Sequence, residues 1–316
     1  MEPSRFLIIT SHRSTDNTWA EREKYVQAFI EQLEDRLEDT KVLYTTYDDI
    51  SCLIKGSQVQ MVDMKHGVDL KDVDVVHFKN WMFDSEQAAT IAFYLQSHGV
   101  AFFNSEVNAG LAWGKIAQMC RLALGDVPVP DSYFAKRAVL AKLFEEDRLP
   151  DGFSFPLIMK ADAGSKGNDN YLIKTAREAL AVLAAAESDK EFVIQKFLPN
   201  DGDYRYLFIG LDSDPIVFHR KGTAGSHLNN TSQGGQGTII PDADIPNEHL
   251  KLARKAAEIL KREISGVDVL VDKATGLPYV LEVNSTPAIA TGYAIERKNA
   301  KFARFLQEIF EQKEEE

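Results

Sequence analysis

The sequence is poor in the features that mark membrane, secreted or disulfide-rich proteins. Its 316 residues include two cysteines, Cys52 and Cys120, which lie in apolar surroundings far apart in the chain. This predicts buried free thiols rather than a disulfide or a metal site. No apolar run approaches the roughly 18 residues that span a bilayer, and the apolar stretch at residues 6–10 is too short for a signal peptide. We therefore expect a cytoplasmic protein that binds no membrane.

Positive charge is also scarce, since 36 Lys and Arg face 48 Asp and Glu and leave a formal net charge of −12. Nucleic-acid binding needs a basic face, so this balance argues against a nucleic-acid partner. Neither G-x-x-x-x-G-K-[ST] nor G-x-G-x-x-G occurs, which removes the main support for a P-loop or a Rossmann site. What remains is an ordinary globular composition, long enough for about two folding units at roughly 150 residues each.

Residues 1–105 alternate short β-rich runs with helical ones. This alternation predicts an N-terminal α/β domain with an open, largely parallel sheet. The expected strands are residues 6–10, 41–46, 73–78 and 100–103, and the expected helices are 19–37 and 85–97.

Beyond residue 105 the pattern changes to α+β. A helix over 106–124, ended by Gly125 and the prolines that follow, opens a linker and small lobe at 106–198, and a C-terminal lobe spans 199–316. The last helix is amphipathic, and its apolar face suits either core packing or a homo-oligomer interface. The expected strands are residues 155–159, 171–173, 191–198, 204–210, 215–219 and 238–240, and the expected helices are 176–186, 247–264 and 294–312.

Residues 266–284 form the most informative stretch. Two β-branched runs flank a turn at residues 272–276, which predicts a β-hairpin. If the turn centres on Thr275, Asp268 lies opposite Glu282, and Asn284 follows on the same face. The other face is expected to be apolar, with Val267, Val269 and Val271 opposite Val283, Leu281 and Tyr279.

Two carboxylates rooted about 5 Å apart across a strand pair repel each other unless a positive charge lies between them. Asp, Glu and Asn offer oxygen ligands, which suit Mg²⁺ or Mn²⁺ rather than Zn²⁺ and leave coordination positions for phosphate oxygens. The alternative is a polar face washed by solvent. The hairpin alone does not decide between these interpretations.

Lys160 is a second candidate, because it ends an apolar run and precedes a loop formed by Gly164, Ser165, Lys166 and Gly167. A lysine beside a glycine loop suits phosphate, through its charge and through backbone N–H groups. Taken alone, it is better explained as an edge lysine followed by a turn. Further along, Asp203 and Arg205 share one side of a strand, and a basic run at 219–221 precedes a polar, glycine-rich loop at 229–237.

The order of these features resembles the ATP-grasp superfamily, in particular its carboxylate–amine ligases related to glutathione synthetase and the RimK-like glutamate ligases. The resemblance covers nearly the whole chain. It is strongest at residues 266–270 and 281–287, and in the spacing of Arg220, Asn230 and the Gly234-Gly235 pair. It implies an N-terminal α/β pre-grasp domain and two α+β lobes that close on ATP.

The resemblance also implies roles at matching positions. Lys115 and Lys160 would hold the α and β phosphates of ATP, and the 164–167 loop would cover them. Asp268, Glu282 and Asn284 would hold two Mg²⁺ ions. The adenosine would lie against Gln195, Lys196, Phe197 and Leu198, with Asp203 near the ribose, and the groups facing the acyl phosphate or the acceptor would be Arg220, Arg205 and Asn230.

Three departures from the family pattern bear on the chemistry. Leu228 stands where glutathione synthetase and RimK-like enzymes carry an arginine that touches the transferred phosphate. Gly114 stands where relatives often have an acid, and Lys196 replaces a common Glu or Gln. The basic substrate motif is replaced at residues 231–233, so the relatives' carboxylate substrate is not carried over.

The leading hypothesis is an ATP- and Mg²⁺-dependent ligase that joins a carboxylate to an amine, each of them a small molecule or a peptide. A kinase that phosphorylates a hydroxyl on the same scaffold is the second hypothesis. An ATP-binding regulatory protein with weakened chemistry is the third, and it rests on Leu228.

Overall fold

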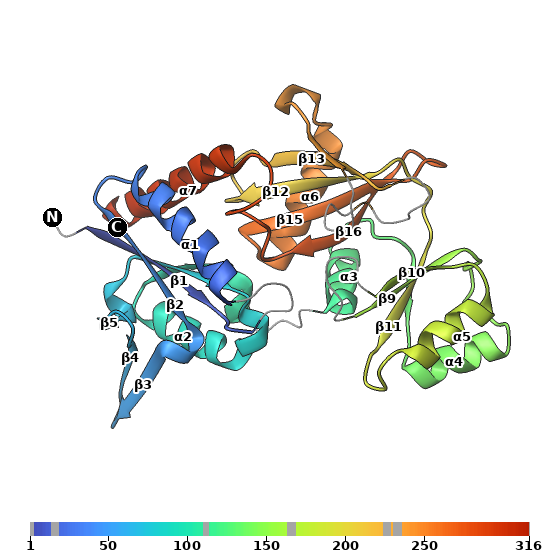
Figure 1. Cartoon of the computed structure of the whole chain (residues 1–316), viewed down its shortest axis with the longest axis horizontal. Helices are drawn as coiled ribbons and strands as arrows, with labels where there is room; N and C mark the ends of the chain where they lie inside the picture. The colour runs from blue at the N-terminus through green and yellow to red at the C-terminus, as the bar shows by residue number, and fades with distance from the viewer. Residues whose placement is uncertain are drawn as a thin grey trace.

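A computed structural model describes residues 3–13, 19–109, 114–162, 169–223, 229 and 236–315. Three segments follow one another along the chain, each with its own sheet, and a small three-stranded sheet adds to the first (Figure 1). The sheets at residues 132–196 and 203–284 form two lobes, which we call the small lobe and the large lobe. No described helix is long and apolar enough to cross a membrane.

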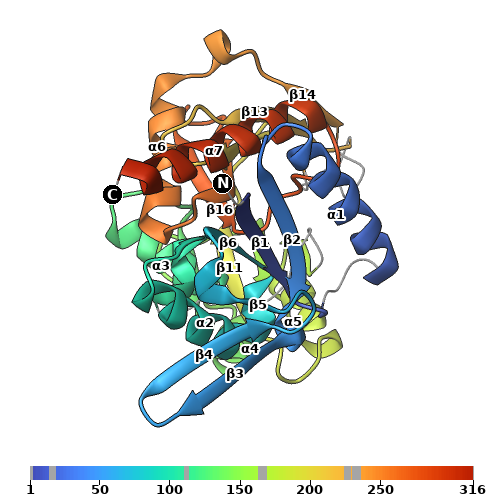
Figure 2. The same cartoon turned by 90° about the vertical axis from the view of Figure 1, so that its left-hand side faces the viewer.

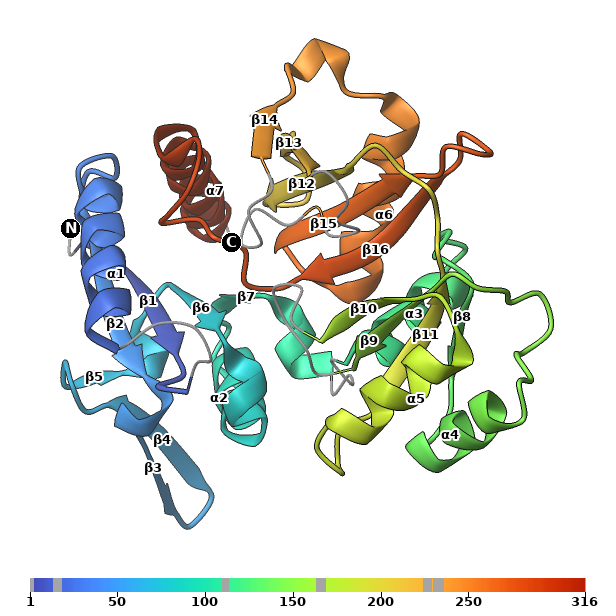
Figure 3. The same cartoon turned by 45° about the vertical axis from the view of Figure 1, so that its right-hand side comes forward.

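The N-terminal sheet is parallel throughout, as the alternation predicted, with the order β2-β1-β6-β7. Two helices, α1 and α7, cover the face that bears Phe6 and Ile8, and α2 covers the face that bears Leu7 and Ile9 (Figure 3). The elements are β1 (Ser4–Thr10), α1 (Trp19–Glu34), β2 (Thr40–Thr46), β6 (Val75–Lys79), α2 (Ser85–Ser97), β7 (Ala101–Phe103) and α7 (Ile295–Glu315).

The apolar face of α7 is used within the chain. Phe302 and Leu306 are fully buried, and the Phe302 ring contacts the rings of Phe6, Phe29 and Phe103. This face therefore packs as core within the chain, and the possible homo-oligomer stays a prediction.

Between β2 and β6 in the chain, a three-stranded antiparallel sheet was not predicted. It is made of β3 (Ile50–Lys55), β4 (Gln58–Asp63) and β5 (Val68–Asp69). The β3–β4 hairpin projects from the N-terminal segment (Figure 2) and leaves Cys52 exposed. Cys120 is exposed as well, and both thiols are free. The prediction of burial is wrong because apolar neighbours in the sequence do not fix which face a residue occupies.

The small lobe is an antiparallel sheet of order β10-β9-β11-β8, with helices on one face. Met159 and Ile194 pack against these helices, so the alternating residues Lys160 and Gln195 lie on the opposite face. One strand and one helix, β8 and α4, were not predicted. The elements are β8 (Ser132–Phe134), α4 (Arg137–Glu145), β9 (Leu157–Ala161), β10 (Asn170–Ile173), α5 (Ala176–Ala185) and β11 (Phe192–Lys196).

The large lobe is a five-stranded antiparallel sheet of order β14-β13-β12-β15-β16. One face packs against α6 through Ala253, Ala256 and Ala257, whose small side chains bring the helix close. The helix ends earlier than predicted, because Lys261 adopts a left-handed conformation (φ 57°) and Ile264 already begins β15. The elements are β12 (Asp203–Ile209), β13 (Ile216–Lys221), β14 (Gln236–Ile239), α6 (Asn247–Leu260), β15 (Ile264–Val271) and β16 (Pro278–Asn284).

The β15–β16 hairpin has the predicted register at its inner end, where Asp268 lies opposite Glu282. Toward the turn a β-bulge shifts the pairing by one residue, so that Val269 faces Val280 and Val271 faces Pro278. The expected pairs with Leu281 and Tyr279 are therefore wrong. A bulge of this kind inserts one extra residue, which a symmetric count from the turn does not reveal.

The predicted helix 106–124 is shorter than expected. Residues Ser105–Ala109 form a 3₁₀ turn, and α3 (Lys115–Leu124) begins at Lys115. The helix covers the outer edge of β16, where the side chain of Gln118 accepts a hydrogen bond from the Val283 N–H at 3.2 Å. This start places Lys115 in the first turn of the helix.

Candidate functional site

One face of the large sheet carries its charged residues. In the strand register Arg205 lies beside Asp268, Asp268 beside Glu282, and Asp203 beside Arg220. Alternation sends the intervening residues to the opposite face, where Tyr206, Val267 and Val283 are core. The pleat therefore gathers onto one face all of the polar side chains predicted from these strands: Asp203, Arg205, Arg220, Asp268, Glu282 and Asn284.

Asp268 is neutralised by two arginines. Its carboxylate accepts bidentate hydrogen bonds from Arg205, with Nε and Nη2 each at 2.7 Å, and Nη2 of Arg220 lies 3.0 Å from Oδ2. Burial raises the pKa of Asp268, but the two guanidinium groups outweigh it and hold that pKa below its usual value. The expectation that only a metal could separate the charges of Asp268 and Glu282 is therefore wrong, because two arginines already supply positive charge beside Asp268.

The remaining oxygens still fit a hard cation. Glu282 is half-buried, and its carboxylate makes no hydrogen bond to another side chain or backbone group in the described ranges. Asn284 donates its amide N–H to the Gly266 carbonyl at 3.4 Å, which leaves its side-chain oxygen to accept. A carboxylate offers about four lone-pair sites, so Asp268 also keeps one. No group of three or more His, Cys, Asp or Glu residues in the described ranges is placed to hold a metal ion, so a cation here would need additional oxygens from a ligand or from water.

Strand β9 brings Lys160 from the small lobe to these acids. Burial lowers the pKa of the Lys160 ammonium to about 8, opposed chiefly by Glu282 and reinforced by the charge of Lys115. Asp268 and Asp203 also act on Lys160 electrostatically. The structure thus brings together two predicted lysines from outside the large lobe and the predicted acids within it.

Lys115 is held by Asp162, which directly follows β9. The Lys115 ammonium donates to the Asp162 carbonyl at 3.2 Å, and the Ile116 N–H donates to the Asp162 carboxylate at 3.0 Å. A side chain at Gly114 would come within 2.6 Å of that carboxylate. The absence of an acid at Gly114 therefore has a steric reason, because Asp162 fills the space and supplies the carboxylate.

The predicted adenine segment lies at the end of β11. Gln195 is buried and donates to the Ser132 hydroxyl at 2.7 Å, while the Lys196 N–H donates to the Asp131 carbonyl at 2.9 Å. The Lys196 N–H is thus already paired within the protein, and contact of the 196–198 backbone with adenine stays a prediction. Asp203, predicted near the ribose, is buried and accepts from Arg220 Nε at 2.6 Å.

Several predicted positions lie outside the described residues. They are Gly164, Ser165, Lys166, Gly167, Leu228 and Asn230. The phosphate-covering loop and the missing family arginine therefore stay predictions.

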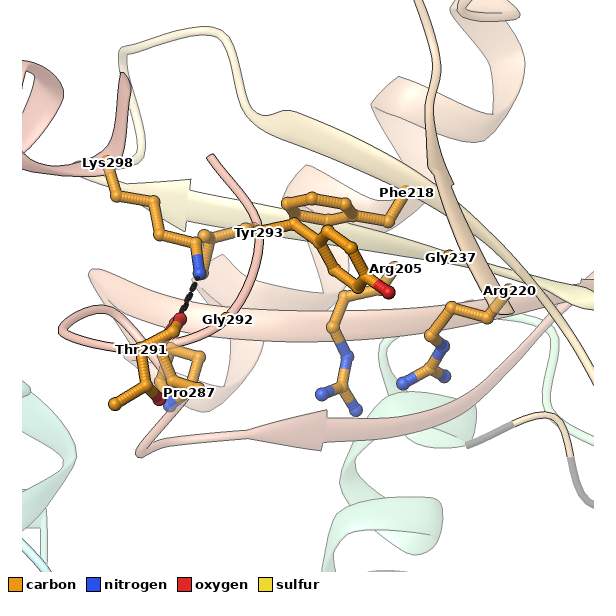
Figure 4. Close-up of a pocket in the computed structure, with 11 residues that line it drawn as sticks. Arg205, Phe218, Arg220, Gly237, Pro287, Thr291, Gly292, Tyr293 and Lys298 are labelled. Carbon is orange, nitrogen blue, oxygen red and sulfur yellow. Dashed lines mark hydrogen bonds between the residues drawn. The ribbon is translucent and has the colours of Figure 1, made fainter. Parts of the chain in front are cut away.

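A pocket of about 550 Å³, open solvent included, lies between β12, β13 and the segment after β16 and was not predicted from the sequence. Figure 4 shows the guanidinium groups of Arg205 and Arg220 side by side at one end and Lys298 at the other. Lys298 is 4% exposed although it lies on α7. A signal was present, because Lys298 precedes the core residue Phe302 by one helical turn and so falls on the apolar stripe.

Comparisons with known proteins identify the family. A RimK-like ATP-grasp domain model matches residues 112–301. A "probable alpha-L-glutamate ligase" of Syntrophotalea carbinolica is 24% identical over 257 residues, covering 76% of this chain and 82% of that protein. A "probable alpha-L-glutamate ligase 2" of Hahella chejuensis is 32% identical over 137 residues, covering 42% and 43%.

Solved structures agree on the fold. D-alanyl-alanine synthetase A of Vibrio cholerae superposes with a TM-score of 0.65 at 13% identity, covering 98% of each chain. The ATP-grasp ligase PsnB, solved with a minimal precursor, superposes with a TM-score of 0.62 at 16% identity, covering 96% of this chain and 99% of that one. The expected ATP-grasp fold is confirmed. This chain belongs to the RimK-like ATP-grasp family and is an ATP-dependent ligase that forms carbon–nitrogen bonds.

Proposed function

We propose that the protein joins a carboxylic acid to an amine through an acylphosphate, using Mg²⁺-ATP. In the first step a carboxylate oxygen attacks the γ-phosphorus, the bond to the β-phosphate oxygen breaks, and ADP leaves. In the second step the amine nitrogen attacks the acyl carbon, the bond to the phosphate oxygen breaks, and inorganic phosphate leaves. The amine proton passes to solvent, and an amide remains.

The observation that carries this proposal is that strand β9 places Lys160 of the small lobe near enough to Glu282 and Asp268 of the large lobe for their charges to raise its pKa against the effect of burial. A triphosphate needs cations along its length, and a divalent metal needs anionic oxygens on its other side. Lysines on one wall and carboxylates on the other supply both. Asp268, Glu282 and Asn284 are the residues that would hold a divalent metal, which when bound would neutralise phosphate charge.

The arginines suit the transferred group. Arg205 and Arg220 are both fixed by carboxylates, so their geometry is set before the substrate arrives. Preorganised cations stabilise charge on a phosphoryl group without the cost of reorganising at the moment of reaction. In this proposal they orient the acid and neutralise the acylphosphate, while closure of the small lobe excludes water.

The test is a phosphate-release assay with pooled carboxylic acids and pooled amines, each pool alone and both together. We expect full ADP release only when acid and amine are both present, and hydroxylamine in place of the amine should give a hydroxamate. ADP release that needs a hydroxyl compound and no amine would instead show a kinase. Binding of Mg²⁺-ATP without turnover across the panel would favour a regulatory protein.

Lys160→Met tests the lysine. The variant should raise KM for ATP by about tenfold or more, because a half-buried cation proposed to lie beside phosphate is lost. Lys174→Met, which removes an exposed lysine just after β10, is the matched control and should leave KM unchanged. An unchanged KM in Lys160→Met would separate Lys160 from the nucleotide.

A further inference from the structure

Lys298 is a buried cation that lacks an acidic partner. Its ammonium donates to the carbonyls of Ala288 and Thr291 at 2.7 and 2.8 Å, and no carboxylate of the described ranges forms an ion pair with it. Two carbonyls use two of the three N–H donors of the ammonium, and the Phe218 ring lies 5.9 Å from it, but none of these groups carries a net charge. Buried charges in proteins are normally paired, so an uncompensated one that lines a pocket points to an anionic ligand.

The other two cations of the pocket are held by carboxylates and, in the proposed function, face the acylphosphate. Arg205 is paired with Asp268, and Arg220 with Asp203 and Asp268. Three cationic side chains and two carboxylates leave about one positive charge, and Lys298 is the group without an acid beside it. Burial lowers the Lys298 pKa to about 8, with the charge of Arg205 adding to the effect. The pocket is therefore matched to one further negative charge.

The walls between the two ends are apolar. Leu207 and Phe218 come from β12 and β13, and Pro287 and Tyr293 come from the segment between β16 and α7. Figure 4 shows the Phe218 and Tyr293 rings close together above the arginines. An apolar body fits these walls, whereas a second carboxylate placed against them would be desolvated without a partner.

We propose that this pocket binds the amine substrate, and that the substrate is an amino acid with an apolar side chain whose carboxylate pairs with Lys298. The inference rests on the proposed ligase function. The amine, on the carbon next to that carboxylate, is then the group that attacks the acyl carbon activated beside Arg205 and Arg220. Lys298 is a specificity residue in this arrangement, and a dicarboxylic amino acid such as glutamate is disfavoured.

A binding experiment tests the proposed amino-acid pocket without requiring turnover. The protein, saturated with Mg²⁺ and a non-hydrolysable ATP analogue, is titrated with leucine, leucinamide and glutamate by calorimetry. We expect leucine to bind about 30-fold more tightly than leucinamide, because the amide lacks the charge that pairs with Lys298. Glutamate should bind at least about tenfold more weakly than leucine because of its second, unpaired carboxylate.

Substitutions on α7 test whether Lys298 causes the preference for leucine over leucinamide. Lys298→Met should lower leucine affinity to that of leucinamide while affinity for the ATP analogue is unchanged, and Lys298→Arg should keep most of the preference. Lys301→Met, on the same helix, is the control and should behave as wild type. Equal binding of leucine and leucinamide to the wild type would overturn the inference, as would a preference that survives in Lys298→Met.

The two proposals fail in different ways. If leucine does not bind but phosphate release still needs an acid and an amine, the inference about the pocket is wrong and the ligase function stands. If the nucleotide does not bind, the proposed function fails before the acceptor is considered.

Discussion

Two buried clusters of arginine and carboxylate lie in this molecule, and they differ in what they leave unpaired. In the first, the closed cluster, Arg262 donates to Glu106 at 2.7 Å and to the Val283 carbonyl, while the Trp81 indole donates to Glu106 at 3.3 Å. Arg262 and Glu106 are each 2% exposed. The second, the cleft cluster, is formed by Asp203, Arg205, Arg220 and Asp268 and borders the pocket of Figure 4.

The closed cluster is complete within the protein. It ties the N-terminal segment to the edge strand β16, and each charged group meets a protein partner. Around the cleft cluster, Glu282, Lys160 and Lys298 form no ion pair with the residues that the structure describes. Arginine–carboxylate pairs thus stabilise the fold in the closed cluster and border a proposed ligand site in the cleft cluster. The two clusters differ in how many charged groups beside them lack an ion-pair partner among the described residues.

The largest expected effect concerns the closed cluster. Glu106→Gln should reduce the free energy of unfolding by about 3–5 kcal/mol, because Arg262 stays charged in the core without a counter-ion. Urea denaturation measures the loss, and turnover per folded molecule should change little. Replacing the pair together, with Glu106→Leu and Arg262→Met, should recover part of the stability. A double variant as unstable as the single one would contradict this account.

At the edge of the cleft cluster we expect a substitution to reduce activity strongly and stability little. Glu282→Gln should lower turnover by about 100-fold, because it removes a carboxylate proposed to hold the metal. Its free energy of unfolding should change by about 1 kcal/mol or less, since Glu282 is half-buried and makes no hydrogen bond with the residues that the structure describes. The loss of turnover is measured over a series of Mg²⁺ concentrations. Glu258→Gln, on the exposed side of α6, is the control. Near-normal activity would remove the hairpin from the mechanism.

The same contrast explains what could be predicted from the sequence. Strand alternation placed Asp268 opposite Glu282, because an apolar pattern of period two fixes the face on which a residue lies. The bulge beyond Asp268 was missed because an inserted residue leaves no mark in that pattern. The arginines that neutralise Asp268 come from two other strands, so their contact with it depends on the order of strands in the sheet.

The role of Lys298 could not be predicted from the sequence of α7 alone. Its position on the apolar stripe of α7 indicated burial, but its neighbours belong to β12, β13 and the segment after β16. These elements are up to about ninety residues away in the chain, and local periodicity carries no information on such contacts. The helix was predicted correctly, whereas the pocket that it completes was not.

The last prediction uses pH to separate Lys298 from the arginines beside it. The Lys298 pKa is lowered to about 8, so this ammonium loses its proton as pH rises through 8, whereas Arg205 and Arg220 stay charged. An anionic ligand should therefore bind with full affinity below pH 8 and lose up to about tenfold per pH unit above it. A suitable probe is 4-methylpentanoate, which keeps the carboxylate and apolar body of leucine but has no amine that titrates.

Binding measured from pH 6 to 10 should show this break in the wild type and in Tyr293→Phe, which removes the phenol that also lines the pocket. Lys298→Arg should move the break beyond the measured range, because a guanidinium keeps its proton throughout. A break that persists in Lys298→Arg would assign the titration to another group, and the single unpaired charge of the pocket would then have to be sought elsewhere than on α7.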